Sequence, residues 1–517
     1  MPSIPFFTYT YTLAIVVGFG ASLSPLRAQT TASPAEAGVT TPTPAELRLL
    51  VEEALDSFGV PGLSVGIYYN DHVVLSEGFG FRESGKPEPV DGATLFAIAS
   101  NTKAFVGTTA AILAGEREDF ALTDRVTAHL PYLDFADPHV TALANVTDLM
   151  SHRIGLGTFK GDHLWWKREL TPRQVLGLAD GLELEYPFRA GYGYSNIGFL
   201  AAGEVISAVA GMPFEEVMRD KIFGPLNMDR TVMHVADLPS HGNYATGHVT
   251  RQGNAPIAPV AWDTPGAAGD IWSSSDDMLK WLAANLHEGV VGADTIWSAS
   301  AQRVAMRPHN TFGGKDDFTS YGLGWFMRKA GEHTVVSHGG GYDGMYSQVQ
   351  LVPSVGFGVV VLTNSMTGAA STIATEIRSR FLGEANEDWL SERLARSREA
   401  DARWFARQDS VDRLLATQAG KPNLVNRIIG SYTDDQYGTF RVMANNSALE
   451  LHFANAPGLT ASLESAGGDH YRLKFAERHA WLERGIAYFT PSPDGDVLRL
   501  FIPNDDIFYD TIAATRD

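Results

Sequence analysis

The sequence predicts an α+β protein, in which an antiparallel sheet flanked by helices is followed by a small all-β barrel domain. Helical apolar spacing occurs near both ends and in the middle of the first 380 or so residues. Strand-like segments lie at both ends of the same region, which favours an antiparallel sheet with helices packed against it. Beyond residue 423 the pattern changes to short alternating strands separated by turn residues, which is typical of a closed or nearly closed barrel.

Composition limits the possible functions. The chain of 517 residues is longer than one core usually serves, so two folded units are expected. The absence of cysteine excludes disulfides, a thiol nucleophile and cysteine metal sites. A formal charge of −20 argues against nucleic acid as a partner. The His, Asp and Glu residues show no metal-ligand spacing, so neither a metal nor another cofactor is expected.

The N-terminus resembles a targeting segment. Phe6 to Gly20 is short and apolar, and Ala28 offers a small residue at a cleavage point, so residues 1–28 are predicted to be a signal peptide. The usual basic residues before the apolar stretch are missing, and an uncleaved anchor is the alternative. Because the stretch is short for a bilayer span, no stable membrane insertion is expected. Residues 29–45 are predicted to form a flexible leader, and the protein to be secreted or periplasmic.

Residues 46–382 are predicted to form the main domain. Apolar spacing predicts helices over Ala45–Phe58, Lys103–Gly115 and Leu200–Ala210. Gly62–Tyr69 and His72–Gly80 read as a hairpin, and Tyr321–Phe326, Thr334–Ser337, Tyr346–Val352 and Gly358–Thr363 as consecutive antiparallel strands. Ser64 matches the Gly-x-Ser-x-Gly elbow of lipases, but that elbow needs a strand-to-helix turn. Since Ser64 lies inside an alternating strand, it is expected to be structural.

The C-terminal part divides in two. Residues 383–424 are charged and helical in character, and are predicted to be a connector. Residues 425–517 are predicted to form the β-barrel. Its strands are expected at Gly438–Met443, Leu449–Phe453, Tyr471–Phe475, Ile486–Phe489 and Val497–Phe501, with turns at Asn445-Asn446-Ser447 and Pro491–Gly495.

A serine and a lysine stand three residues apart at the start of an apolar helical pattern, as Ser100 and Lys103. On a helix this spacing places both side chains on one face, within contact. A serine hydroxyl becomes a good nucleophile when another group takes its proton. A lysine amine can do so when burial or neighbouring charge lowers its pKa. A serine cap followed by a surface lysine has the same spacing, so the interpretation depends on two further segments.

Those segments fit the same chemistry. Tyr194 and Asn196 lie two residues apart in a Gly-rich turn before a helix, where a phenol can relay protons and an amide can bind lysine or substrate. A core tyrosine and a helix-capping asparagine are the alternatives. His338 enters the triplet Gly339-Gly340-Gly341 after a β-branched run. Glycines let another backbone approach closely, as a substrate strand would, although an ordinary hairpin loop has the same composition.

In this order, the three segments resemble the serine beta-lactamase and penicillin-binding protein superfamily, whose signature is Ser-x-x-Lys, Tyr-x-Asn and a Lys-Thr-Gly or His-x-Gly strand. The version with tyrosine and histidine is similar to the branch of class C beta-lactamases, D-aminopeptidases and family VIII esterases. The segment from Asp148 to Leu156 also resembles a family block, and its His152 is expected to be structural. The likeness covers roughly residues 46–380. The C-terminal module resembles the lipocalin-like domain of some relatives.

The resemblance implies a sheet domain and an all-helical lobe with the active site between them. It implies that Ser100 forms an acyl-enzyme, that Lys103 and Tyr194 share the proton transfers, and that Asn196 orients Lys103 and the substrate amide. The backbone N–H groups of Ser100 and Gly341 would form the oxyanion hole, in a strand that also contains Gly340. Which of the lysine and the tyrosine is the base stays open.

His338 bears on the substrate, because many penicillin-recognising members place a lysine there to bind the drug's carboxylate. A neutral imidazole weakens that interaction, so strong beta-lactamase activity is not expected. A peptidase or amidase acting on short or D-residue-containing peptides is the preferred function. The alternatives are a carboxylesterase or acyltransferase, a weak beta-lactamase, and a non-catalytic sensor. The expected partner is a small molecule or short peptide, and an oligomer is compatible with the sequence.

Overall fold

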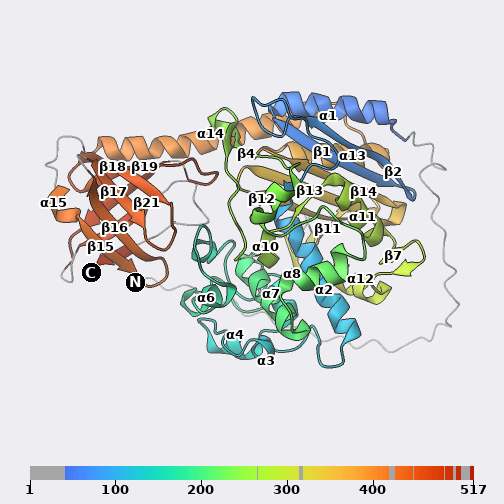
Figure 1. Ribbon diagram of the computed structural model, residues 1–517, viewed down its shortest axis with the longest axis horizontal. Helices are drawn as coiled ribbons and strands as arrows, with labels where there is room; N and C mark the ends of the chain where they lie inside the picture. Colours follow the sequence, from blue (N-terminus) through green and yellow to red (C-terminus); the bar gives the residue numbers. More distant parts are fainter. Residues whose placement is uncertain are drawn as a thin grey trace, which may run out of the picture.

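The computed structural model describes residues 41–517 apart from 265, 314–317, 419–424, 446–447, 483, 493–495 and 502–512. The predicted signal peptide, the leader up to residue 40 and parts of both predicted barrel turns lie outside the described residues. Figure 1 shows a mixed helix and sheet body and a separate barrel, joined along one side by the long helix α14 (Trp389–Ala416). This is the α+β architecture with a C-terminal barrel that the sequence predicts.

The main sheet has eight antiparallel strands in the order β2-β1-β14-β13-β12-β11-β10-β9. They span Gly62–Tyr69 (β1), His72–Gly80 (β2), Asn310–Phe312 (β9), Thr319–Tyr321 (β10), Phe326–Ala330 (β11), His333–Tyr342 (β12), Met345–Val352 (β13) and Phe357–Thr363 (β14). Three short pairs lie outside it: Phe96–Ala97 (β3) with Trp272–Ser273 (β6), Gly247–Val249 (β4) with Ala255–Ile257 (β5), and Val290–Val291 (β7) with Asp294–Thr295 (β8).

Helices cover both faces of this sheet. Successive residues of β14 belong to different cores: Val359 and Val361 pack with α1 (Pro44–Phe58) and α13 (Ala369–Phe381), whereas Val360 and Leu362 face the larger core. On that second face lie α2 (Thr102–Glu116), α11 (Ser275–Leu286) and α12 (Ala299–Met306). A strand buried on both faces reads as a continuous apolar run, as β14 does.

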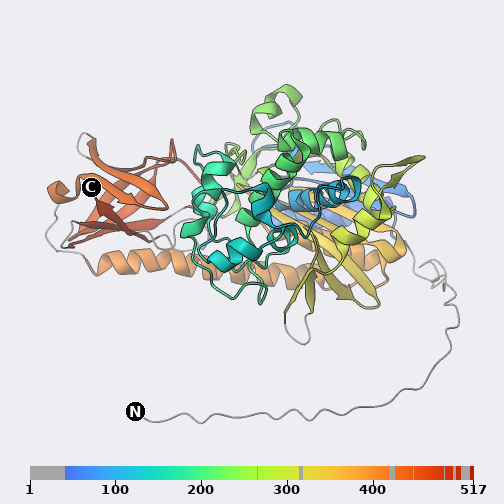
Figure 2. The same cartoon turned by 90° about the horizontal axis from the view of Figure 1, so that it is seen from below.

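The segment between α2 and α11 is rich in short helices and forms the lobe beside the sheet (Figure 2). Its α-helices are Val126–His129 (α3), Pro138–Leu143 (α4), Val146–Met150 (α5), Pro172–Leu176 (α6), Asn196–Ala210 (α7), Phe214–Met218 (α8), Leu238–His241 (α9) and Gly266–Gly269 (α10). Short 3₁₀ turns are Asp162–Leu164 (η3), Ala179–Gly181 (η4), Val235–Asp237 (η6) and Thr250–Gln252 (η7), and Arg219–Phe223 (η5) is a π-helix directly after α8. Ala99–Asn101 (η2) precedes α2, and Pro353–Val355 (η8) precedes β14.

The C-terminal domain is a closed barrel of eight antiparallel strands in sequence order. They span Gly430–Asp434 (β15), Gly438–Asn445 (β16), Ala448–Phe453 (β17), Thr460–Gly467 (β18), His470–Phe475 (β19), Gly485–Thr490 (β20), Val497–Phe501 (β21) and Ala513–Arg516 (β22), after the short helix Val425–Ile428 (α15). The five strands expected from the sequence correspond to β16, β17, β19, β20 and β21. The three others are shorter or less regularly alternating, and closure of the barrel requires them.

The predicted strand Tyr321–Phe326 is wrong, because its middle is the turn between β10 and β11. Gly324 has a φ of +88°, and a Cβ on it would lie 2.2 Å from the carbonyl oxygen of Lys103. A Cβ on Gly107 of α2 would lie 1.9 Å from the carbonyl oxygen of Leu323. These two glycines let the turn pack directly on the helix that carries Lys103, so tertiary contact overrides the apolar pattern.

The hairpin β1–β2 is confirmed with its predicted bounds. Ser64 is fully buried, and its hydroxyl lies 2.7 Å from that of Ser275, as expected for a structural residue. The predicted leader extends too far, because α1 begins at Pro44, capped by Thr43 and Glu46. Among the described residues no single helix is long and apolar enough to cross a membrane, although α7 and Phe214–Phe223, bent by 78°, pass together on length and composition.

Candidate active site

Ser100 lies in the turn η2 at the start of α2, half-buried beside the end of β12. The residue before it, Ala99, has a φ of +48°, in the left-handed region that alanine rarely adopts. Such strain persists only where the surroundings enforce it, and it is common at functional sites. Here the turn is held by Asn101, whose amide donates to the hydroxyl of Ser347 at 2.8 Å.

Lys103 is fully buried on the first turn of α2, and its Nζ lies 3.1 Å from the Oγ of Ser100. The same Nζ donates to the carbonyl oxygen of Ala268 in α10 at 2.6 Å. Burial lowers the pKa of Lys103 to about 7, with Asp162 acting in the opposite direction. A neutral amine that donates to Ala268 keeps its lone pair free to accept the serine proton.

Tyr194 precedes α7 and packs its ring against the same amine, whose Nζ is 4.8 Å from the ring centroid. Burial raises the pKa of Tyr194, while the Ser100 hydroxyl acts in the opposite direction. The phenol is therefore protonated near neutral pH. The ring of His152 packs against that of Tyr194, with 4.4 Å between the ring centroids, and its Nδ1 accepts from the backbone N–H of Ser195 at 3.0 Å. The expected structural role of His152 is confirmed.

Asn196 is the first residue of α7, but the cap of this helix is Ser195, whose Oγ accepts from Gly198. The amide nitrogen of Asn196 donates to Asp162 at 2.7 Å, and its Oδ1 has no hydrogen-bond partner among the described residues. Asn196 thus acts on Lys103 through the carboxylate of Asp162, whereas direct orientation of the lysine was expected. Its unpaired oxygen remains available to an N–H donor.

Asp162 was missed by the sequence analysis, because it has no motif and lies in the short turn η3. It is 2% exposed and also accepts from the indole of Trp165 at 3.2 Å. Burial raises its pKa to about 7, although Asn196, Trp165 and Lys103 all favour the charged form. The site therefore holds a carboxyl and an amine that both titrate near neutrality and interact with each other.

The glycine triplet lies on β12, beyond the part of that strand that β11 covers. β11 pairs with His333–Ser337 only, while β13 pairs with β12 as far as Tyr342. A Cβ on Gly340 would lie 2.2 Å from the carbonyl oxygen of Ile98 and 3.0 Å from the Cβ of Ala99. The backbone that approaches the glycines is thus the turn that carries Ser100, and not only a substrate. Gly340 sets the distance between the strand and the nucleophile, with Gly341 next to it.

His338 is 2% exposed, and both of its ring nitrogens are bonded within the protein. Nδ1 lies 2.6 Å from the carbonyl oxygen of Gly339, so it carries the proton, and Nε2 then accepts from the hydroxyl of Tyr321 at 2.9 Å. Burial and, secondarily, Lys103 lower its pKa to about 3. The neutral ring fits the expectation of weak carboxylate binding. Both bonds are internal to the protein, and a contact of His338 with substrate stays a prediction.

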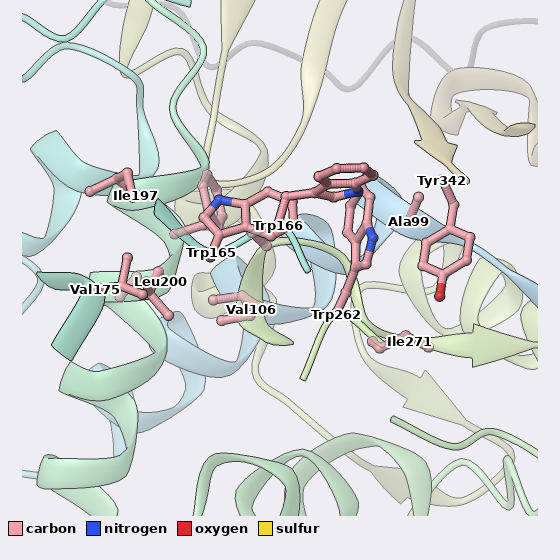
Figure 3. Close-up of a cluster of buried hydrophobic side chains, with 14 of the residues drawn as sticks. Ala99, Val106, Trp165, Trp166, Val175, Ile197, Leu200, Trp262, Ile271 and Tyr342 are labelled. Atoms are coloured by element: carbon pink, nitrogen blue, oxygen red, sulfur yellow. The ribbon is translucent and has the colours of Figure 1, made fainter. Parts of the chain in front are cut away.

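Three buried tryptophans, called the tryptophan wall below, lie in the core between the lobe and the sheet. Figure 3 shows Trp165, Trp166 and Trp262 lying between Ile197 and Leu200 of α7 and Tyr342 of the sheet. The indole of Trp262 donates to Asp343 at 3.0 Å. Burial raises the pKa of the Asp343 carboxyl to about 6, against the effects of Trp262, Trp166 and Trp481. This wall has no sequence motif either.

The barrel contributes to the same wall through the segment Ala476–Leu482 between β19 and β20. A Cβ on Gly341 would lie 3.8 Å from the ring of Trp481, and His479, 3% exposed, packs edge-on against Trp166 at 5.9 Å. At a second contact the ring of Tyr437 stacks on His163 at 4.1 Å. The catalytic and barrel cores form one continuous apolar cluster.

The described residues contain one group of three side chains that could hold a metal ion, His234, Asp263 and Asp270. None of Ser100, Lys103 or Tyr194 belongs to it. The sequence analysis missed this group, because its members come from separate loops and show no regular ligand spacing along the chain.

Comparison with known proteins agrees with the fold. The beta-lactamase family model matches residues 47–382. The unguisins hydrolase ungD' of Aspergillus campestris (strain IBT 28561) is 28% identical over 333 residues, which is 61% of this chain and 60% of the relative. Protein flp of Staphylococcus aureus (strain MW2) is 26% identical over 324 residues, 62% of each chain. The alignments therefore span less than two thirds of these relatives.

A solved structure shares the fold over most of the chain. The octameric penicillin-binding protein homologue from Pyrococcus abyssi superposes with a TM-score of 0.58 at 19% identity, covering 91% of this chain and 99% of that one. At this identity the likeness concerns the fold, including the region of the barrel.

Proposed function

Since the chain belongs to the beta-lactamase family, a family of serine hydrolases, we propose that it hydrolyses amide bonds of short peptides, including peptides with D-residues, through an acyl-enzyme on Ser100. The observation that carries the proposal is the Nζ of Lys103, fully buried and 3.1 Å from the Oγ of Ser100. A buried amine with a pKa of about 7 can take the serine proton at neutral pH, which an ordinary lysine cannot.

In the acylation step the Oγ of Ser100 attacks the substrate carbonyl carbon while its proton passes to Lys103. The negative charge that develops on the carbonyl oxygen lies beside the backbone of Ser100 and Gly341, whose N–H groups are proposed to stabilise it. The protonated phenol of Tyr194 then supplies a proton to the leaving amine and recovers one from Lys103. Water takes the place of the amine, and the same groups run the steps in reverse to release the acid.

A short peptide is the substrate that the surroundings fit best. A cleft of about 630 Å³ lies between the main domain and the barrel; Asp343, two residues beyond Gly341, lines it, whereas Ser100, Lys103 and Tyr194 do not. Charges of both signs line this cleft, namely Lys167, Arg168, Glu169, Glu477 and Arg478. Lys167 and Glu477 pair with each other at 3.9 Å, and we propose that the charged termini of a short peptide bind beside them. The neutral, internally bonded His338 supplies no cation for a beta-lactam carboxylate.

Substitution of Ser100 or Lys103 tests the mechanism. Ser100→Ala and Lys103→Ala are expected to lower kcat by about 10⁴-fold or more, because the nucleophile and its base act as one unit. Ser64→Ala, which alters the other serine in a hydrolase-like motif, is expected to stay active. Circular dichroism checks that each variant folds. A Ser100→Ala variant with normal turnover would refute the assignment.

A substrate panel distinguishes the proposed activity from its relatives. A fluorescent phosphonate is expected to label the full chain but not Ser100→Ala, which excludes a non-catalytic sensor. Aminoacyl p-nitroanilides of both chiralities, p-nitrophenyl esters and nitrocefin then compare peptidase, esterase and beta-lactamase activities, and added amines detect acyl transfer. We expect the highest kcat/KM with the anilides. A preference for esters by more than about tenfold would identify an esterase instead.

Export and assembly are proposed on separate grounds. We propose that residues 1–28 are removed during export. After expression in a host that exports the protein, N-terminal sequencing is expected to find a start near residue 29.

Because a structural relative is named as an octamer, we propose that this chain also forms an oligomer. Light scattering coupled to gel filtration measures its mass against the 56.0 kDa of one chain.

A further inference from the structure

Three acidic or imidazole side chains gather in a cleft of about 230 Å³ in the lobe, outside the Ser100 site. They are His234, Asp263 and Asp270, and one ligand atom of each lies within 4.8 Å of the others. The Nδ1 of His234 is 3.2 Å from Asp263 and 3.9 Å from the Oδ2 of Asp270. Separations of this size are those between neighbouring ligands on one metal ion bound at about 2.0–2.2 Å.

The fold brings these residues together by backbone pairing. Val232 and Trp272 form an antiparallel bridge, with both of its N–H groups bonded across. His234 stands two residues after one partner and Asp270 two residues before the other, so the two face each other in register. Asp263 arrives from the loop that ends at α10. The geometry of the group is therefore fixed by the main chain.

Asp270 supplies the second, independent observation. It is 1% exposed, and among the described residues neither of its carboxylate oxygens has a hydrogen-bond partner. The other charged groups that act on it, Asp263 and Asp237, are acidic as well. The nearest cationic group is the imidazole of His234, 3.9 Å from the Oδ2 of Asp270, and a buried carboxylate with no closer counter-charge is costly. A cation in the cleft, where the Oδ2 of Asp270 faces His234, removes that cost.

We propose that His234, Asp263 and Asp270 bind one divalent transition-metal ion of the Zn²⁺ or Mn²⁺ type, with water or Glu215 of α8 completing its coordination. One imidazole with two carboxylates suits these ions better than Mg²⁺ or Ca²⁺, which take mainly oxygen ligands. Glu215 lines the same cleft and acts on His234, which adds to the negative field. Because His234 and Asp263 are 41% and 54% exposed, the ion can enter from solvent.

The proposed metal site lies on the loop that contacts Lys103, the candidate base. Asp263 and Asp270 are the two ends of the segment that contains α10, and the carbonyl of Ala268 in α10 accepts from Lys103 at 2.6 Å. A metal bound to both ends holds this segment in place. The inference does not depend on the proposed peptidase activity, since metal binding is measured directly.

Titration of the chelator-treated full chain with ZnCl2, MnCl2 and MgCl2 tests the inference, by calorimetry and by thermal unfolding. We expect one Zn²⁺ or Mn²⁺ per chain with a raised Tm, and no effect of MgCl2 at equal concentration. His234→Gln and Asp270→Asn are expected to weaken binding at least tenfold and to abolish the rise in Tm. Two variants are used because a change at the buried Asp270 can also affect folding, whereas His234 is half-exposed and its change is tolerated more easily.

His287→Gln is the matched control. His287 is 39% exposed and lies 3.2 Å from Asp71, but among the described residues it belongs to no group of three ligands. This variant is expected to bind the ion as the unaltered chain does. Absence of stoichiometric binding to the unaltered chain would overturn the inference and leave Asp270 as a protonated carboxyl. Binding that survives both His234→Gln and Asp270→Asn would overturn it equally, by placing the ion elsewhere.

Discussion

At the scale of single residues, Lys103 owes its reactivity to burial. Its side chain is 0% exposed, and desolvation lowers its pKa to about 7, while the carboxyl of Asp162 opposes this shift. Asp162 in turn is buried, with its own pKa raised to about 7. Protons therefore leave the pair in two steps that belong to both groups. In the proposed mechanism, the two residues set the pH range in which Ser100 is activated.

The activity is expected to rise with pH through about 7. Below the pKa of Lys103 its ammonium has no lone pair, so kcat/KM falls about tenfold for each pH unit, and above that pKa it reaches a plateau. A pH profile of kcat/KM with an anilide substrate measures this rise, called the acidic limb of the profile. An activity that is constant from pH 5 to 8 would contradict a lysine base.

Asp162→Asn is expected to move this limb to lower pH. The carboxylate favours the ammonium form of Lys103, so its removal lowers the pKa of the lysine further. Because burial raises the pKa of Asp162 to about 7, its carboxyl is mostly protonated at pH 6, so the shift is expected to be small there and largest at and above pH 7. Asp343→Asn is the control, since it alters another buried carboxyl that is not among the groups acting on Lys103. Equal shifts in both variants would show a general effect of buried charge.

At the scale of elements, two backbones in close contact hold the site together. The strand β12 touches the turn η2 at Gly340, and the β10–β11 turn touches α2 at Gly107 and Gly324. Side chains at these positions would push the nucleophile and its base away from the strand. The Gly triplet is thus required by packing inside the protein, in addition to any approach of a substrate.

Gly340→Ala and Gly339→Ala form a matched pair for this contact. At Gly340 the added Cβ would lie 2.2 Å from the backbone oxygen of Ile98, which cannot move without displacing Ser100. At Gly339 the closest atom is the side-chain oxygen of Gln348 at 3.2 Å, which can rotate away. We expect kcat/KM to fall about 100-fold for Gly340→Ala and by less than about fivefold for Gly339→Ala. Similar losses in both variants would refute the role of the contact.

At the scale of the whole molecule, the barrel is joined to the catalytic domain by more than the helix α14. The segment Ala476–Leu482 reaches the tryptophan wall, and the ion pair between Lys167 and Glu477, at 3.9 Å, lies at the edge of the shared cleft. Both views show the barrel beside the lobe that carries η3 (Figures 1 and 2). We therefore predict that the barrel limits the length of the proposed peptide substrate.

Trp481→Ala is expected to relax this limit. Removal of the ring opens space next to Gly341, so kcat/KM for a tetrapeptide anilide relative to a single aminoacyl anilide is expected to rise about tenfold. His470→Ala removes a ring from β19 that stacks on Tyr488, and serves as the control. An unchanged ratio in Trp481→Ala would show that the segment does not contact the substrate.

The sequence alone determined the order and identity of the groups that are proposed to carry the chemistry. The spacing of Ser100 and Lys103, the turn with Tyr194 and the Gly triplet are local patterns, as are the hairpin β1–β2 and most barrel strands. Each depends on neighbours within a few residues, which a sequence displays directly. The family resemblance rested on these same local patterns.

Only the tertiary structure decided how those groups behave. The pKa of Lys103, the carboxyl of Asp162, the bonds of His338, the position of Trp481 and the cluster of His234 with Asp270 all arise from residues far apart in the chain. Burial and hydrogen bonding between such residues follow from packing, and packing leaves no regular spacing to read. The sequence thus names the reactive atoms, and the fold sets their charge and the space around them.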